Sequence, residues 1–250
     1  MDNEIRKTKI EQLLSSTDEL LSSADELFSS NEAFLRSLRT DLSKYGIEAY
    51  LNMYGVDRCY YMVHQDNLAS ILANGILSHN KARGLPHHDF SLDWMQDQRE
   101  KIIPETGRQL HDYANLYFAT HTPMQYILTH PNKWDHEIIE QKALVFIEAD
   151  ALKVFMTSGV VFTDGGAGRF RAKFYTNPAD LRQLDWDIIR KRKGTSMEYK
   201  LRKSAEVLVP DVIPINVFRR IVVFSEEMRA VVNRLPHLPC PCHVDRTLYY

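Results

Sequence analysis

Residues 190–214 read RKRKGTSMEYKLRKSAEVLVPDVIP, and the interpretation of the chain starts from this stretch. Four consecutive basic residues and a polar part lead into the apolar run AEVLV, which Pro210 closes. Aliphatic residues that end at a turn signal predict a short buried strand. Glu206 lies within this strand, where burial is unfavourable for a carboxylate unless it is paired or hydrogen-bonded. Glu206 is therefore either a member of a structural ion pair or a working group.

The composition is that of an ordinary globular protein, with 250 residues, 44% hydrophobic and 26% charged, and a net charge of -2. This length suits one large domain with an appendage. The balanced net charge conceals a local excess of basic residues between positions 169 and 203. Three cysteines form no disulfide framework, and neither a signal segment nor a membrane-spanning window is present, so we expect a cytoplasmic protein.

The N-terminal segment contains a seven-residue repeat in residues 13–40, LLSSTDE, LLSSADE, LFSSNEA and FLRSLRT. Its narrow apolar stripe predicts helical structure, which we expect to end at Gly46. Two interpretations remain open: the helices pack on their own domain, or residues 10–40 form a coiled coil for self-association or for a partner. We therefore predict a helical extension in residues 1–50 and a main domain in residues 51–250.

The first half of the main domain places a histidine where a strand gives way to a helix. Residues 60–63 favour a strand, and a helix follows with apolar residues at helical spacing until Gly75. His64 thus lies beside a helix N-terminus, where polar ligands often bind. The alternative is a histidine that only packs or caps the turn.

A long polar loop follows in residues 80–113, and loops of this length are usually functional or disordered. Arg99 and Arg108 are its candidate anion contacts, although an arginine in a charged loop is often merely solvated. Residues 115–120, NLYFAT, then predict a strand, and a helix begins near Pro123.

The second half supplies strands at residues 143–149, 159–163 and 220–224, with short helices between them. Without regular β-α-β alternation, this pattern predicts an α+β domain with a mostly antiparallel sheet. Glycines at positions 165, 166 and 168 lack the spacing of a phosphate-binding loop and indicate a tight turn. The segment HLPCPCH crowds four metal-ligand types together and suits zinc poorly, so no metal site is predicted.

Three segments occur in a consistent order: YMVHQDNLASILANGIL, LHDYANLYFATHTPMQYIL, and VVFTDGGAGRF with the later LDW and AEVLV. Together they resemble the DarT family of DNA ADP-ribosyltransferase toxins over residues 59–224. The resemblance implies two small, mostly antiparallel sheets flanking an NAD cleft. It also implies transfer of ADP-ribose from NAD to a base of single-stranded DNA, and a macrodomain antitoxin as partner.

The same resemblance assigns the site residues. The implied catalytic residues are Glu206, His64 and Arg99, with Arg108 as the alternative arginine. The implied NAD contacts are His64, Gln65, Asn67, Arg99, Tyr117 and Phe118, although the two aromatic rings could equally be plain core residues. The loop before the catalytic strand faces the acceptor in such enzymes, which assigns Arg190, Lys191, Arg192, Lys193, Tyr199, Lys200 and Arg202 to DNA binding, unless the loop is simply solvated.

Two other functions remain open. The chain could modify RNA or protein, or it could be a degenerate transferase that only binds NAD or nucleic acid. The sequence leaves the modified base undetermined.

Overall fold

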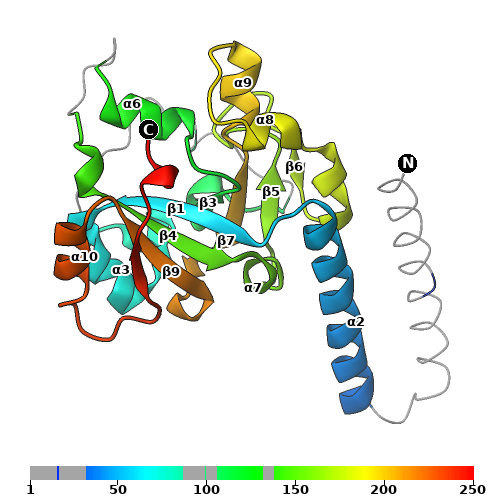
Figure 1. Ribbon diagram of the computed structural model, residues 1–250. Coiled ribbons are helices and arrows are strands. Elements are labelled where there is room, and N and C mark those ends of the chain that lie inside the picture. Colours follow the sequence, from blue (N-terminus) through cyan, green and yellow to red (C-terminus); the bar gives the residue numbers. More distant parts are fainter. Residues whose placement is uncertain (1–15, 17–31, 87–98, 100–105, 132–137) are drawn as a thin grey trace.

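The computed structural model describes residue 16, residues 32–86, residue 99, residues 106–131 and residues 138–250 (Figure 1). The helices are α2 (Glu32–Met53), α3 (Leu68–Asn74), α4 (His79–Ala82), α6 (Pro123–Thr129), α7 (Ala151–Phe155), α8 (Trp186–Arg190), α9 (Met197–Arg202) and α10 (Glu226–Val232). The 3-10 helices are η1 (Gln65–Asn67), η2 (Leu110–Asp112), η3 (Gln141–Ala143), η4 (Pro178–Gln183), η5 (Ile215–Val217) and η6 (Arg246–Leu248). The strands are β1 (Arg58–His64), β2 (Ile76–Leu77), β3 (Tyr113–Tyr117), β4 (Leu144–Asp150), β5 (Val161–Thr163), β6 (Phe174–Tyr175), β7 (Glu206–Pro210), β8 (Val212–Ile213), β9 (Phe218–Val223) and β10 (Cys242–Val244).

The strands form an eight-stranded sheet in the order β10-β9-β4-β1-β3-β7-β5-β6 and a two-stranded sheet of β2 and β8. All pairs are antiparallel except β10 with β9. The predicted α+β class with two mostly antiparallel sheets is confirmed, and the sheets are unequal in size. Within the large sheet, β1 and β3 are joined by a single register pair, Tyr60 with Tyr117, so the sheet consists of two four-stranded halves that meet at this point.

Apolar residues alternate between the two faces of the large sheet, as the period of a strand requires. On one face Cys59, Val63 and Ile147 belong to the main core, which α3 and α7 help to cover. On the other face Met62 and Phe146 pack with Tyr249, whose hydroxyl donates to the carbonyl oxygens of strands β4 and β9. The last residues of the chain therefore complete a second core.

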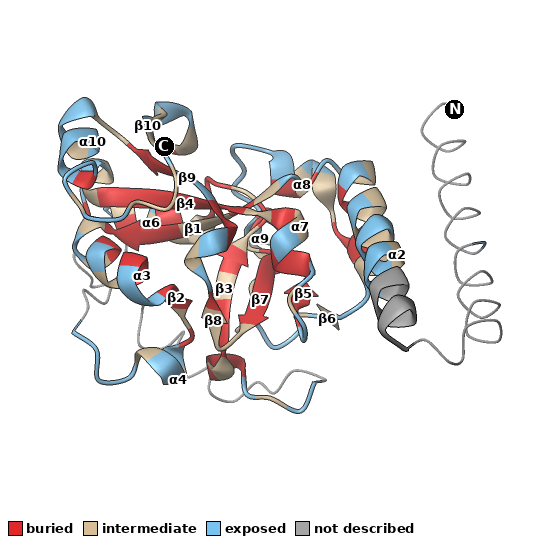
Figure 2. Ribbon diagram, turned by 90° about the horizontal axis from the view of Figure 1, so that it is seen from below, coloured by how far each residue is buried: buried red, intermediate tan, exposed pale blue. Residues whose placement is uncertain are grey.

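Helix α2 runs through Gly46 to Met53, so the predicted end at Gly46 is wrong. The helix continues because Ile47, Tyr50 and Leu51 pack against the main core, and Leu51 is buried. This packing outweighs the low helix propensity of one glycine. Figure 2 shows the C-terminal end of α2, the upper end in that view, beside the sheet domain. Most of the seven-residue repeat, and with it the predicted self-association through residues 10–40, lies outside the described residues. The division at residue 50 stays a prediction.

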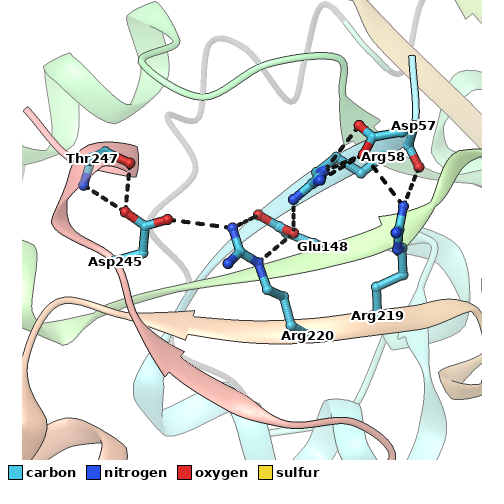
Figure 3. Close-up of polar contacts among 7 residues, drawn as sticks. All are labelled: Asp57, Arg58, Glu148, Arg219, Arg220, Asp245 and Thr247. Atoms are coloured by element: carbon cyan, nitrogen blue, oxygen red, sulfur yellow. Dashed lines mark hydrogen bonds and ion pairs between the residues drawn. The ribbon is translucent and has the colours of Figure 1, made fainter. Parts of the chain in front are cut away.

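The carboxylate of Glu148 is buried on the face of the sheet that carries the second core. Only 1% of its side chain is exposed. Arg220 donates to both of its carboxylate oxygens at 2.7 and 2.8 Å, and Arg58 donates to Oε2 at 2.9 Å. Asp245 and Asp57 extend this network at its two ends (Figure 3). The fixed contacts hold β1, β4, β9 and the C-terminal segment together. In the described part of the chain, no helix is both long and apolar enough to span a membrane.

Candidate active site

Glu206 is the first residue of β7, as predicted, and is 4% exposed. Strand β3 lies beside it, with Tyr117 directly opposite in the antiparallel register. Because Tyr117 in turn pairs with Tyr60, Glu206 lies next to the point where the two half-sheets meet. This is the place in the large sheet where its hydrogen-bonded ladder is weakest.

Both carboxylate oxygens of Glu206 have defined partners. Oε1 accepts a hydrogen bond from the backbone amide of Ala167 at 2.9 Å, and Oε2 accepts one from Nη1 of Arg99 at 3.1 Å. One donor is a fixed backbone group and the other is a cation. Such a carboxylate is fixed in orientation before any ligand binds, which is the requirement for electrostatic catalysis.

The glycine turn after β5 supplies the backbone donor. A methyl group on Gly165 would lie 2.9 Å from the carbonyl oxygen of Leu201, so only glycine fits against the end of α9. A methyl group on Gly166 would approach Oε1 of Glu206 to 3.9 Å. The predicted tight turn is thus present, and its role is to bring the amide of Ala167 to the carboxylate.

The two candidate arginines have different partners. Arg99 contacts Glu206, and its side chain is only 16% exposed. Arg108 instead pairs with Asp211 at 2.8 Å and lies over the ring of Tyr113, 5.5 Å from its centroid. Of the two, the structure brings Arg99 to the carboxylate of Glu206.

His64 ends β1 and caps the 3-10 helix η1, as its predicted place at a strand end requires. Its Nδ1 accepts a weak hydrogen bond from the amide of Asp66 at 3.4 Å, and the Asp66 carboxylate is 3.2 Å away. The amide suits an unprotonated Nδ1 and the carboxylate suits a protonated one, so each ring tautomer has a partner at this position. Gln65 and Asn67 follow within η1 and are both half-buried.

Tyr117 ends β3 and Phe118 directly follows it, so their side chains point to opposite sides of the strand. Burial and the negative charge of Glu206 raise the pKa of Tyr117, while Arg99 lowers it, so its hydroxyl shares the surroundings of the candidate site. The ring of Phe118 belongs to the main core, where it packs edge-on against Trp186 at 5.3 Å. For Phe118 the geometry therefore favours the core role that the sequence left open.

Several members of the predicted acceptor loop have partners inside the protein. Arg190 donates to the carbonyl of Tyr54 and lies over the ring of Trp186. Arg202 pairs with Asp164 at 2.6 Å and with Glu198 at 2.8 Å. These two arginines hold the loop in place, and their charges are already engaged.

Tyr199 is 5% exposed, with its hydroxyl donating to the carbonyl of Lys191 at 3.2 Å. Its ring packs so closely on Gly194 that a methyl group there would lie 2.4 Å from a ring atom. The buried Tyr199 side chain therefore stabilises the loop through its contacts with Gly194 and Lys191. Lys191, Lys193 and Lys200 are exposed, and Arg192 donates to the carbonyl of Tyr249 at 3.2 Å.

A cavity of about 1010 Å³ lies between the loop, α9 and α6. Figure 1 shows α6, the C-terminus and α9 on the same side of the strands. The cavity is lined by Pro123, Tyr126, Ile127, His130, Arg169, Arg192, Lys193, Gly194, Thr195, Met197, Tyr199, Lys200 and Tyr250. Four residues of the predicted acceptor set are thus brought together here.

The sequence interpretation missed the groups that complete this region. The Ala167 amide has no side-chain signal, and Tyr250 lies far from the loop in the sequence. Tyr126 and His130 are four residues apart in and after a helix, so their spacing could have indicated a shared face. In the sequence, Arg169 is distinguished only as one member of the basic excess between positions 169 and 203.

The segment around Cys240 and Cys242 shows no metal geometry. Within the described ranges, no group of three or more histidine, cysteine or acidic residues could hold a metal ion. Both cysteines are free and half-buried, and burial raises the pKa of each thiol to about 11.

The structure of Thermus sp. 2.9 DarT in complex with ADP-ribosylated single-stranded DNA matches with a TM-score of 0.69 and 24% identity, over 78% of this chain and 97% of that one. The same protein in complex with NAD+ matches with a TM-score of 0.65 and 25% identity, over 78% and 98%. Residues 60–250 match the family model described as DarT, ssDNA thymidine ADP-ribosyltransferase, and the chain belongs to this family.

Two curated relatives agree with this family. The DNA ADP-ribosyl transferase of Thermus sp. (strain 2.9) is 28% identical over 192 residues, which cover 73% of this chain and 90% of the relative. A DNA ADP-ribosyl transferase-DNA ADP-ribosyl glycohydrolase fusion protein of Thermosipho africanus is 26% identical over 200 residues, 73% of this chain and 48% of the fusion. The resemblance inferred from the sequence motifs is thereby confirmed.

Proposed function

We propose that the protein transfers a single ADP-ribose unit from NAD to thymidine in single-stranded DNA and acts as the toxin of a toxin–antitoxin pair. The observation that carries the proposal is the buried Glu206, whose two oxygens are held by the Ala167 amide and by Arg99, in a chain of the DarT family. The family description names thymidine as the modified nucleoside, which supports this base over the others left open by the sequence.

The chemistry suits the geometry of Glu206. Breaking the bond between nicotinamide and ribose develops positive charge on the sugar, as in glycoside hydrolysis. A carboxylate that is already oriented stabilises this charge without reorganising. We assign this role to Glu206.

Arg99 and His64 supply positioning groups. A guanidinium has five N–H donors, so Arg99 can hold Oε2 of Glu206 and still donate to a phosphate of NAD or to the acceptor base. The imidazole of His64 suits a ribose hydroxyl, because a ring nitrogen can pair with a hydroxyl as donor or as acceptor. Half-buried Tyr117 suits the wall beside nicotinamide. Gln65 and Asn67 are the further proposed donor-site contacts. We do not extend this role to Phe118, whose ring fills the core.

The basic loop is the proposed acceptor side. Its exposed lysines, Lys191, Lys193 and Lys200, can neutralise phosphates of a DNA strand. Arg192 lines the adjoining cavity, whereas Arg190, Arg202 and Tyr199 shape the loop through their internal contacts.

We further propose a DNA ADP-ribosyl glycohydrolase as the antitoxin partner, because the Thermosipho relative carries such an activity in the same chain. The proposed location is the cytoplasm, where such a partner and single-stranded DNA would be met.

The test uses purified protein, NAD and a single-stranded oligonucleotide with one thymidine, analysed by mass spectrometry. We expect a single ADP-ribose adduct on the thymidine and none when another base replaces it. Glu206→Gln, which keeps the shape but removes the charge, should lower the rate by roughly 100-fold or more. Glu140→Gln is the matched control, because Glu140 is an exposed glutamate that pairs with Lys142.

The alternatives predict other outcomes in the same assay. Adducts confined to RNA or to protein would identify a different acceptor. Oligonucleotide binding without consumption of NAD would indicate a degenerate binding module. A fully active Glu206→Gln variant with unchanged circular dichroism would contradict the proposed role of the carboxylate.

A further inference from the structure

The cavity between α6 and α9 has one wall built of aromatic rings. Tyr126 and His130 stack with their centroids 4.2 Å apart and an interplanar angle of 12°. Tyr250 meets both rings edge-on, at 5.3 Å from Tyr126 and 5.6 Å from His130. Tyr126 is 46% exposed and is one of the lining residues of the cavity. Neither Tyr126 nor Tyr250 belongs to the hydrophobic clusters of the described residues.

Other lining residues of the cavity are cationic. Arg169, Arg192, Lys193 and Lys200 line the cavity, and no aspartate or glutamate is among its described lining residues. The whole chain has a net charge of -2, so this concentration of one sign is a local feature. Cations together with exposed aromatic rings are the combination that holds a nucleic acid strand, because the cations bind phosphates and the rings stack on bases.

The cavity is linked to the catalytic carboxylate by two short connections. Arg169 lies two residues after Ala167, whose amide binds Glu206, and the Arg169 amide donates to the carbonyl of Gly166 at 3.0 Å. Helix α9, which contributes Met197 and Lys200 to the cavity, leads through Ser204 into β7. A strand in the cavity would therefore continue toward the site of transfer.

We propose that this aromatic wall, and Tyr126 in particular, stacks on a nucleobase flanking the acceptor base of single-stranded DNA. The inference rests on the proposed function, since it takes the bound strand to be the substrate. Every base has a π-face, so such a contact supplies affinity at any flanking sequence and positions the strand. Tyr126 is a binding residue in this account and takes no part in the chemical step.

The experiment measures binding of a fluorescent single-stranded oligonucleotide by anisotropy, without NAD. Tyr126→Ala should weaken binding about 10-fold, as loss of one base stack does. Tyr126→Phe retains the ring and should bind as the native protein does. Tyr45→Ala removes an exposed tyrosine of α2 outside the cavity and serves as the matched control.

A second oligonucleotide distinguishes the loss of base stacking from a loss of charge contacts and from misfolding of the variant. In it, abasic residues replace the nucleotides on both sides of the acceptor thymidine, while the phosphates remain. The native protein and Tyr126→Ala should bind this strand equally. Equal losses with both strands, or native affinity of Tyr126→Ala for the complete strand, would overturn the proposal.

Steady-state kinetics give an independent check. Tyr126→Ala should raise the KM for DNA about 10-fold and leave kcat and the KM for NAD unchanged. A strand that binds through Tyr126 but receives no ADP-ribose would contradict the proposed function alone. A strand that is modified normally by Tyr126→Ala, with native KM, would contradict only this inference.

Discussion

The hydroxyl group of Thr163 accepts a hydrogen bond from the backbone amide of Glu206 at 3.0 Å and donates one to the carbonyl of Gly165 at 2.6 Å. One buried side chain thus ties the first residue of β7 to the glycine turn. Since the next residues of that turn carry the Ala167 amide, Thr163 sets the distance between the carboxylate and its backbone donor. It is a positioning residue for Glu206.

Replacing Thr163 by valine should therefore impair catalysis through position. Valine has a similar shape but can neither accept from Glu206 nor donate to Gly165. We expect Thr163→Val to lower kcat roughly 10-fold with little change in the KM for NAD, because small displacements of a catalytic group are costly. Thr163→Ser keeps the hydroxyl and should restore most of kcat. If both variants have native kcat, Thr163 does not position the site.

The two loop arginines should differ in their contribution to activity. Arg99→Ala removes the cation at Oε2 of Glu206 and should lower kcat/KM by roughly 100-fold. Arg108→Ala breaks an exposed pair with Asp211, and such pairs contribute little, so activity should stay within about 2-fold. Rates of ADP-ribose transfer to the thymidine oligonucleotide provide the measurement. A larger loss in Arg108→Ala would instead assign the catalytic arginine to position 108.

The Glu148 network should contribute to stability and not to catalysis. Arg220→Met leaves a buried carboxylate with one cation fewer and should lower the free energy of unfolding by about 3 kcal/mol. Arg219 is the neighbouring residue on β9, and its pair with Asp57 is exposed (Figure 3), so Arg219→Met should cost only ~0.5 kcal/mol. Urea denaturation compares the two variants. Equal losses would show that burial does not distinguish the two ion pairs.

Lys203 should make stability depend on pH in the alkaline range. Burial lowers its pKa to about 8 from 10.5, and its ammonium group donates to the carbonyl of Ile189 at 2.6 Å. Between these two values the unfolded chain binds more protons than the folded protein, so the free energy of unfolding rises with pH.

The contribution of Lys203 is isolated by comparison with Lys203→Met. From pH 8 to pH 10.5 the native protein should gain about 3 kcal/mol relative to this variant, because one pKa unit corresponds to about 1.4 kcal/mol. Urea denaturation at several pH values measures the difference. Parallel profiles for the two proteins would contradict a lowered pKa.

Local patterns were sufficient to predict much of the fold. The apolar run closed by Pro210 indicated β7, and His64 lies at the strand end where its neighbours placed it. These features depend on residues close together in the sequence. The prediction at Gly46 was wrong because long-range packing of Leu51 and its neighbours extends α2, and no local pattern reports such contacts.

The candidate site was predictable in its side chains but not in its geometry. A motif resemblance pointed to Glu206, yet the choice between Arg99 and Arg108 depended on which one reaches the carboxylate across 107 positions of sequence. The backbone amide of Ala167 leaves no sequence signal. Tyr250 joins Tyr126 only because the C-terminal segment returns to the sheet. The run of basic residues in the sequence also gave no indication that Arg190 and Arg202 have partners inside the protein.

The two half-sheets that meet at Tyr60 and Tyr117 are interleaved along the chain, which matters during protein synthesis. Strands β3 and β5 emerge from the ribosome early, but both pair with β7, which begins only at residue 206. Until then the second half-sheet has no central strand, and the chain has no Glu206. A chain that ends before this position therefore lacks both Glu206 and the central strand of the second half-sheet.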